Sequence, residues 1–450
     1  MLKKFKKYCR NYILEIIVFT FALLTRFIRL GIPKGHMFDE VYHAFTAQEM
    51  FRGNPAAWEW WNTPPKGFAY EWTHPPLAKE FMVLAISIFG DNSFAWRFFS
   101  ALFGFGVIIL IYLIAYKLFK SRMVALFAAF VASMDGLLLV MSRIAMNDMY
   151  FLFFILLAFL FFLNNRKFLM ALSLGLSVAA KWTGLFGIGI IGILFLSQLF
   201  LKFYKKQENK RKILKNFISA PLYFLIIPLL VYLAVYLPFF TGHHTPPGQN
   251  PSQFNVNTFI GLQEQMYWYH TRLKATHPYQ SIPEQWIFDL RPVWIYVDYK
   301  DNSIANVYNL GNPLFMWFGL SSVVFLALEL LKRLFDFLNR KQIKKNTLSI
   351  FTVLIGYFGF FLPWVGSPRI MFYYHYMPAV PFLAIATGYV LNNLFTEKIG
   401  KIFAFLFILF LIILFIYFLP LWTAIYIPRC VNPQGCVSWY DSYFWFSSWR

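Results

Sequence analysis

The chain has 450 residues, of which 59% are hydrophobic, 22% are aromatic and 14% are charged. Soluble globular domains carry about 25% charged residues, so this composition excludes an ordinary soluble domain. The net charge of +21, from 41 Lys and Arg against 20 Asp and Glu, would suggest nucleic-acid binding in a soluble protein. In a membrane protein with many spans the same excess is expected, because Lys and Arg collect in the cytoplasmic loops.

Long apolar runs recur along the whole chain. A helix of about 20 apolar residues crosses the hydrocarbon layer of a bilayer, and on this criterion we predict an all-α polytopic membrane protein with eleven spans. A full-length span follows the basic N-terminal segment without a small-residue cleavage site, so we interpret it as a retained helix and not a signal peptide. The predicted spans are 11–30, 96–118, 123–141, 148–164, 167–181, 183–201, 217–240, 313–332, 347–364, 370–391 and 402–427.

The charges alternate from one predicted loop to the next. If the N-terminus is cytoplasmic, the loops on its side hold 25 of the 41 Lys and Arg, while 15 of the 20 Asp and Glu lie on or near the other side. Scattered surface charge would not follow the spans in this way. We therefore predict a multi-pass cell-membrane protein with no nucleic-acid partner, a cytoplasmic N-terminus and an external C-terminal tail at 428–450.

Two predicted external loops, 31–95 and 241–312, are too long to be simple connections, and long loops often carry function. Both are rich in Trp, Tyr, Pro and His, which suits a surface at the lipid headgroups. Within the first loop, 77–90 is apolar but too short to cross, so we predict a helix lying in the membrane interface. We expect 1–450 to form one membrane domain with its catalytic residues in the first loop.

The segment HMFDEVYH, just after the first predicted span, carries the adjacent carboxylates Asp39 and Glu40. A carboxylate held against apolar surface tends to have a raised pKa, which suits a general base. Taken alone, the same pair would also fit a solvated helix N-terminus.

Further ionisable residues lie at the external ends of the predicted spans, where they are costly unless they are paired or face water. Each of these residues could have a purely structural role, or its side chain could extend towards the lipid headgroups. Arg143, for example, could pair with Asp148 and hold two helices together. As a group they would surround Asp39 with cations, as binding of a lipid-borne phosphate requires. They are His74, Lys79, Asp135, Arg143, Asp148, Lys181 and Arg369.

Seven motifs spread over most of the chain resemble, in this order, those of the protein O-mannosyltransferases, a family with the class C glycosyltransferase fold. Alanine at position 78 replaces the family's usual glycine, and the second external loop is too short for the β-trefoil domain of eukaryotic members. The likeness is therefore to the shorter bacterial or archaeal type. The motifs are FDE (38–40), HPPLAK (74–79), SRIAMND (142–148), AAKWTGLF (179–186), RPVWIY (291–296), LGNPLFMW (310–317) and RIMFYYHYMPAVPFLA (369–384).

The resemblance implies inverting transfer of mannose from a polyprenyl-phosphate donor to Ser or Thr hydroxyls of secreted or membrane proteins, on the external face of the bilayer. By their match to the family motifs, Asp39 is the expected base and Glu40 orients a neighbour or the acceptor. A dimer of the chain is left open. The donor phosphate is expected to be bound by Lys181, Arg369, His74, Arg143, Tyr374 and His375, with Lys79, Asp148 and Asp135 in support.

We expect no cofactor and no required metal, since the Asp-x-Asp triplet with which many nucleotide-sugar enzymes hold a cation does not occur in the sequence. Zinc bound by Asp39 with His43, or by His243 with His244, is the alternative. Two other functions stay open, namely transfer of a lipid-linked sugar such as aminoarabinose to a glycolipid, and secondary transport. Of the three cysteines, Cys430 and Cys436 would share the external tail as a disulfide or as free thiols, and Cys9 would be cytoplasmic.

Overall fold

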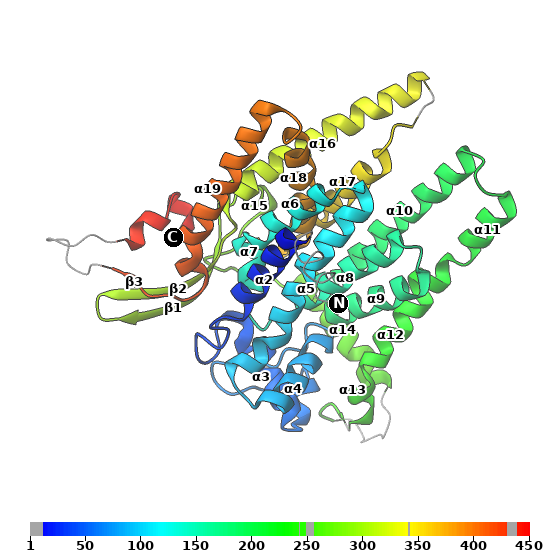
Figure 1. The fold of residues 1–450 in the computed structure, drawn as a ribbon. Helices are drawn as coiled ribbons and strands as arrows, with labels where there is room; N and C mark the ends of the chain where they lie inside the picture. The colour runs from blue at the N-terminus through cyan, green and yellow to red at the C-terminus, as the bar shows by residue number, and fades with distance from the viewer. Residues whose placement is uncertain (1–11, 243, 249–255, 341–342, 430–438) are drawn as a thin grey trace, which may run out of the picture. The chain divides into compact units, whose positions relative to one another are not determined.

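The computed structural model describes residues 12–242, 244–248, 256–340, 343–429 and 439–450. Helices dominate these residues, and they carry one small antiparallel sheet (Figure 1). Contacts divide the chain into two compact units. The first consists of Met1–Pro33, Ala101–Ile144 and Ala275–Arg450, and the second of Lys34–Ser100 and Ala145–Lys274. The three cysteines and His243 lie outside the described residues, so the pairing of Cys430 with Cys436 is not tested.

Seven helical segments of the described chain are long and apolar enough to cross a membrane, and they match seven of the eleven predicted spans. The other four predicted spans coincide with shorter helices, so the crossings that they make stay a prediction. The seven are α5 (Ser93–Phe119), α10 (Gly184–Tyr204), Lys210–Val235, α16 (Pro313–Arg340), Thr347–Trp364, Tyr373–Leu394 and α19 (Lys398–Trp422). The shorter helices are α2 (Ile13–Phe27), α6 (Arg122–Ser133), α8 (Asp148–Leu163) and α9 (Lys167–Ala180).

The predicted span 123–141 is interrupted. It forms α6 and a separate short helix, α7 (Gly136–Met141), with Asp135 between them. The Asp135 carboxylate accepts a hydrogen bond from the backbone N–H of Leu138 at 2.8 Å and so caps the start of α7. A side chain that satisfies the free N–H groups of a helix start favours a new helix over continuation of the old one.

The predicted span 217–240 is also irregular. It comprises α11 (Lys210–Ile218), the π-helical turn η3 (Leu222–Ile226), α12 (Ile227–Val235) and α13 (Leu237–Thr241). Pro221, Pro228 and Pro238 lie at the joints between these pieces. Proline lacks the N–H that would continue a helix, which explains why the apolar run is not one straight helix.

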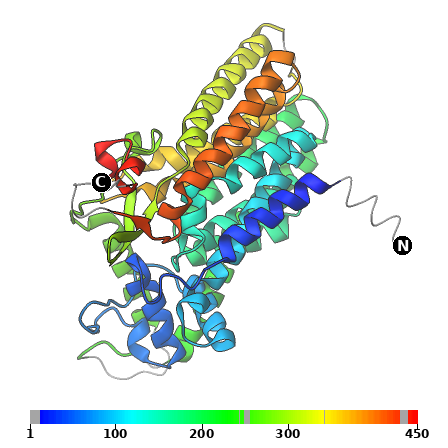
Figure 2. The same cartoon turned by 60° about the vertical axis from the view of Figure 1, so that its left-hand side comes forward.

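In the first unit, α18 (Val380–Leu394) forms the centre of the helix packing. It contacts α6, α16 and α17 (Thr347–Phe361), and most of its residues are buried. A Cβ atom at Gly388 would lie 2.6 Å from the carbonyl oxygen of Val124, so only glycine allows α18 and α6 to approach this closely. Figure 2 shows α16 and α19 running side by side in the same unit.

In the second unit, α8, α9, α10 and α12 pack against one another. A Cβ atom at Gly187 of α10 would lie 1.9 Å from Ile155 of α8, which makes this another close helix contact. The polar part of the unit contains η1 (Phe38–Val41), α3 (His43–Phe51), η2 (Pro55–Trp58), α4 (Leu77–Phe89) and α14 (Val256–Arg272). The helix predicted at 77–90 is present as α4, and its position in the membrane interface stays a prediction.

The expectation of an all-α chain missed a small sheet in the first unit. Strands β1 (Val293–Lys300) and β2 (Ser303–Asn309) form an antiparallel hairpin with Val293 opposite Asn309, and β3 (Ile427–Pro428) pairs with the start of β2. Short helical turns complete the unit, at α15 (Pro283–Trp286), η4 (Leu362–Trp364), η5 (Tyr373–Ala379), η6 (Tyr440–Tyr443) and η7 (Ser447–Trp449).

Candidate active site

The two adjacent carboxylates of η1 have different surroundings. Glu40 is fully buried and accepts two hydrogen bonds from the Arg97 guanidinium, both at 2.7 Å, and two more from the backbone N–H groups of Met37 and Ala145. Four bonds use the acceptor capacity of a carboxylate, and a bidentate Arg pair is geometrically rigid. Glu40 therefore holds η1 in place from within the protein.

Asp39 is half-buried, and no group of the described residues donates a hydrogen bond to its carboxylate. Burial raises the pKa of Asp39 to about 7; the neighbouring carboxylate of Asp148 adds to the shift, Lys181 opposes it, and Glu71 adds to it. A carboxylate with a pKa near the working pH is ionised in a substantial fraction of molecules and still accepts a proton readily. Asp39 thus has the properties of a general base.

Glu71 organises the loop before α4 and was not singled out in the sequence. Its carboxylate contacts the Lys79 ammonium at 2.7 Å, His74 Nδ1 at 3.3 Å and His43 Nδ1 at 3.6 Å. Lys79 Nζ also donates to the backbone carbonyls of Glu71 at 2.8 Å and His74 at 3.0 Å. Buried Lys79 therefore has three acceptors for its three protons, and its support of phosphate binding stays a prediction.

The protonation of this cluster follows from burial and charge. Burial alone would raise the pKa of Glu71, but Lys79, His74 and His43 outweigh it, and the pKa lies well below its usual range. Burial lowers the pKa of His74 well below its usual value, although Glu71 opposes the shift. His74 is accordingly neutral near pH 7. Its single N–H, at Nδ1, is directed to Glu71 and to the hydroxyl oxygen of Thr73, so Nε2 carries a lone pair and no proton.

Lys181 forms an ion pair with Asp148 in the second unit, with 2.8 Å between Nζ and Oδ1. Asp148 is the first residue of α8, so its carboxylate also lies at the positive end of a helix dipole. The pairing of Arg143 with Asp148 stays a prediction. Asp39, Glu71, His74, Lys79, Asp148 and Lys181 all belong to the second unit.

Three of the predicted phosphate ligands, Arg369, Tyr374 and His375, belong to the first unit. Tyr374 and His375 are buried in η5, with their rings stacked at 4.7 Å. His375 Nδ1 lies 3.1 Å from the backbone N–H of Phe372, within the same turn. Arg369 precedes this turn and is half-buried. A phosphate-binding role for these residues stays a prediction.

Arg143 and Asp135, also in the first unit, make mainly structural contacts. Arg143 Nη1 donates to the backbone carbonyls of Thr25, Arg26 and Ile28 at 2.8–3.0 Å, and Nη2 to that of Arg29 at 3.2 Å. These are carbonyls at the end of α2, where the helix itself offers no donors. Besides capping α7, Asp135 accepts from the backbone N–H of Asn312 at 3.0 Å, and its support of phosphate binding stays a prediction.

The residues weighed as zinc ligands have other contacts. His43 faces Glu71, and His244 Nδ1 lies 3.0 Å from Glu59. Within the described residues, no cluster of three or more His, Cys, Asp or Glu side chains could hold a metal ion. That catalysis needs no metal remains a prediction.

Sequence comparison identifies the family of the chain. A profile described as dolichyl-phosphate-mannose-protein mannosyltransferase matches residues 16–243. A second profile, the C-terminal four-transmembrane region of protein O-mannosyltransferase, matches residues 255–449. The chain belongs to the protein O-mannosyltransferase family. It is therefore a membrane glycosyltransferase, as the motifs predicted.

Full-length relatives have the same family name. The chain is 24% identical to the polyprenol-phosphate-mannose–protein mannosyltransferase of Mycolicibacterium smegmatis, over 98% of this chain and 93% of the relative. It is 26% identical to the enzyme of the same name from Corynebacterium glutamicum, over 96% of this chain and 92% of the relative. The expected likeness to short bacterial members is confirmed by these two coverages.

Solved structures confirm the class C glycosyltransferase fold. The Saccharomyces cerevisiae Pmt1-Pmt2 complex bound to its sugar donor matches with a TM-score of 0.79 at 16% identity, over 98% of this chain and 93% of that chain. ArnT from Cupriavidus metallidurans matches with a TM-score of 0.54 at 15% identity, over 84% of this chain and 60% of that chain. Membership of a glycosyltransferase family with this fold excludes the secondary-transport alternative.

Proposed function

We propose that this glycosyltransferase moves mannose from a polyprenyl-phosphate donor to Ser or Thr hydroxyls of exported proteins, with Asp39 as the general base. The names of the full-length relatives support the donor and a protein acceptor, and the Ser or Thr hydroxyls come from the family resemblance of the motifs. The observation that carries the assignment of the base is the contrast within η1. Glu40 is saturated with hydrogen bonds, whereas Asp39 keeps a half-buried carboxylate, a pKa of about 7, and no donor among the described residues.

The reaction is a single displacement at the anomeric carbon. As the acceptor oxygen forms the new bond to this carbon, its proton passes to Asp39. The bond from the carbon to the phosphate oxygen breaks on the opposite side, which inverts the configuration. The leaving group is the polyprenyl phosphate, whose charge rises during the step and needs fixed cationic donors.

Lys181 is the proposed donor to this phosphate in the second unit. It is buried, and its ammonium is oriented by a 2.8 Å contact with Asp148, so little reorganisation would be needed during the reaction. His74, whose Nδ1–H is directed to Glu71 and Thr73, stays a phosphate ligand predicted from the sequence alone. We keep Arg369, Tyr374 and His375 as donors predicted from the sequence. Arg143 is given a structural role, since its guanidinium is occupied by backbone carbonyls of α2.

The orientation in the membrane is part of the proposal. The distribution of Lys and Arg favours a cytoplasmic N-terminus, and the active site and the C-terminus would then be external. The yeast neighbour is a complex of two related proteins. For this chain a dimer is a proposal, which mass photometry of the detergent-solubilised protein would test.

Reconstituted transfer would test the function. The purified chain in liposomes receives radiolabelled polyprenyl-phosphate mannose with either a Ser/Thr-rich peptide or a membrane glycolipid as acceptor. We expect label on the peptide, and Lys181→Ala should raise the donor KM more than the acceptor KM. Label on the glycolipid alone would refute the proposal in favour of the glycolipid-transferase alternative.

The same assay would test the proposal that no metal takes part. Turnover should be unchanged after dialysis against a strong chelator, because the proposed step uses only side chains. Loss of turnover that one metal ion restores would show that the proposal is wrong.

A further inference from the structure

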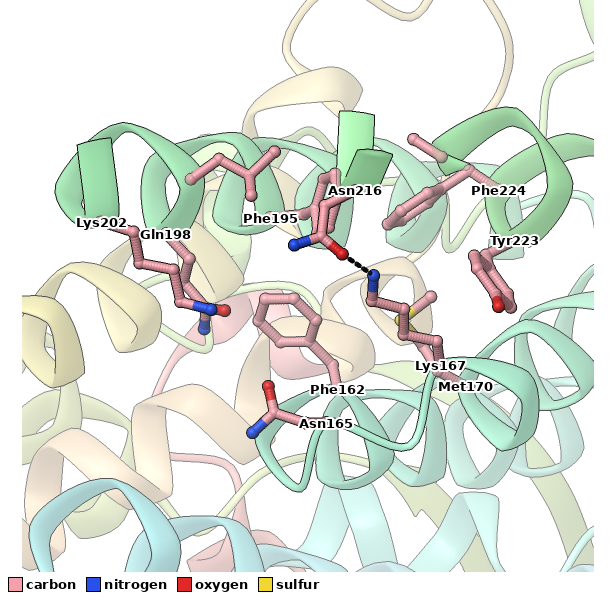
Figure 3. A pocket seen from close by; sticks show the side chains of 12 residues that line it. Phe162, Asn165, Lys167, Met170, Phe195, Gln198, Lys202, Asn216, Tyr223 and Phe224 are labelled. Carbon is pink, nitrogen blue, oxygen red and sulfur yellow. Dashed lines mark hydrogen bonds between the residues drawn. The ribbon is translucent and has the colours of Figure 1, made fainter. Parts of the chain in front are cut away.

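A pocket with both polar and apolar walls lies in the second unit, among α8, α9, α10, α11 and the π-helical turn η3. Its cavity volume is about 40 Å³, and it is open to solvent on one side. Figure 3 shows Lys202 and Gln198 together on one side, and Lys167 meeting Asn216 on the other. The walls between them are apolar and include Phe162, Met170, Phe195, Leu199 and Phe224. None of these residues belongs to the candidate active site.

The pocket holds its two cations in fixed positions. Lys167 Nζ donates to Asn216 Oδ1 at 2.7 Å and lies 5.6 Å from the ring centre of Phe195 and 5.7 Å from that of Tyr223. Lys202 Nζ contacts Glu208 at 3.1 Å. Two aromatic faces and an amide orient Lys167 without cancelling its charge. An ammonium held in this way retains protons with which to bind an anion.

The chain around the pocket is strongly basic. The segments 166–167 and 202–216 contain nine Lys or Arg and one acid, Glu208. This excess favours an anionic ligand over a zwitterionic one. The same segments are among those that the charge distribution predicts to be cytoplasmic, where the leaflet surface is negative.

Apolar surface adjoins the basic residues. Phe217 and Ile218 at the end of α11 are 57% and 68% exposed, and Leu225 of η3 is 63% exposed. In the span Lys210–Val235 only 11% of the most apolar window is buried. Such a face requires hydrocarbon around it, so acyl chains would run along α11 and α12 directly beside the pocket.

From this arrangement we infer a binding site for the phosphate headgroup of an anionic phospholipid, with Lys167 and Lys202 as its cationic ligands and Gln198 and Asn216 as further donors. The acyl chains lie against the exposed apolar residues of α11 and η3. The site is separate from the transfer reaction and does not depend on the proposed substrates. It would tie α8–α9 to α10–α11 through one bound lipid.

The test compares melting temperatures of the full-length chain in nanodiscs of phosphatidylcholine alone and of phosphatidylcholine mixed with phosphatidylglycerol. We expect phosphatidylglycerol to raise the melting temperature of the wild type. The double variant Lys167→Gln/Lys202→Gln should lose at least half of this increase. The control Lys205→Gln/Lys206→Gln removes the same charge from two exposed residues of the same segment and should keep the increase.

A second variant guards against loss of folding. Gln198→Glu keeps both lysines but adds a negative charge to the pocket, so it should lower the number of phosphatidylglycerol molecules retained in native mass spectrometry. Equal effects of the two double variants, or no loss with Gln198→Glu, would overturn the inference. Inorganic phosphate in phosphatidylcholine nanodiscs forms a third arm. An increase as large as that from phosphatidylglycerol would assign the pocket to a free anion and overturn the lipid assignment.

Discussion

At the scale of single residues, the adjacent carboxylates of Asp39 and Glu40 have different properties because they have different hydrogen-bond partners. Glu40 has two guanidinium and two backbone donors, which stabilise its charge and fix its position. The Asp39 carboxylate is desolvated by burial and receives no compensating hydrogen bonds. Its pKa is therefore raised to about 7. Two adjacent acids are thereby divided into one that positions the segment and one that can accept a proton.

Asp39→Asn should abolish transfer, because asparagine cannot accept the proton of the acceptor hydroxyl. We expect kcat to fall by at least about 100-fold, the usual minimum for loss of a general base, with the donor KM little changed. The reconstituted assay measures both. Asp301→Asn, the same exchange in the turn of the β1–β2 hairpin, should leave kcat unchanged. A variant at position 39 that retained a tenth of the activity would show that another group is the base.

The pH dependence should report the same residue. Only ionised Asp39 can act as base, so kcat/KM should fall about tenfold per unit as pH drops below about 7 and level off above it. Initial rates between about pH 5 and about pH 9 would show this limb. A rate that is flat over the range would mean that Asp39 has an ordinary carboxyl pKa or is not the base.

The sequence could predict Asp39 because it lies in a motif at a membrane boundary, where a carboxylate is costly. It could not assign Glu40 its structural role, since the partner, Arg97, lies 57 positions away. Glu71 was missed for a similar reason. It stands three residues before His74, but its role depends on the approach of His43 from α3.

At the scale of elements, the end of α2 depends on a residue from another part of the chain. Arg143 supplies donors to the carbonyls of four residues at or just beyond its end, in one buried and three partly buried hydrogen bonds. Without them these carbonyls would lose their partners in an apolar environment, which is costly.

Arg143→Gln should therefore destabilise the protein, by about 3 kcal/mol if two charge-assisted bonds are lost. A lower melting temperature in detergent, with the donor KM of the folded fraction unchanged, is the expected result. Arg52→Gln, which removes an arginine whose side chain is 55% exposed, should change the melting temperature little. If Arg143→Gln instead raised the donor KM at an unchanged melting temperature, the phosphate role predicted from the sequence would be correct.

The loop before α4 is held by the buried pair of Glu71 and Lys79, at 2.7 Å. Removing one partner of a buried pair leaves an uncompensated charge and costs about 3–5 kcal/mol. Glu71→Gln and Lys79→Met should each lower the melting temperature, and the double variant should lose clearly less than the sum. Additive losses would show that the two side chains do not interact. This double-mutant cycle isolates the pair from their other contacts.

Element positions were largely predictable, because a bilayer demands apolar helices and the apolar runs are unmistakable. The breaks were not. The helix break at Asp135 is stabilised by Asn312, and the sheet pairs β2 with β3 from the end of the last long helix. Both depend on contacts between segments far apart in the chain, which a local pattern does not contain.

At the scale of the whole molecule, the charge of +21 is the basis of the predicted topology. The basic loops include 202–216 beside the lipid pocket, whereas the carboxylates Asp39, Glu71 and Asp148 lie together in the candidate active site. A cytoplasmic basic face and an external acidic site are what the positive-inside rule requires for an enzyme that modifies exported proteins.

Cysteine labelling would test this orientation. In a chain whose three cysteines are replaced by serine, Lys205→Cys and Asn302→Cys each place one thiol at an exposed position, the first in the basic segment and the second in the turn of the hairpin. An impermeant maleimide should label position 302 in intact cells and position 205 only after lysis. The reverse pattern would place Asp39 on the cytoplasmic side, where exported proteins would not reach it after crossing. One predicted span, 217–240, separates the two positions. Labelling of both positions in intact cells would contradict this crossing and with it the predicted count of eleven spans.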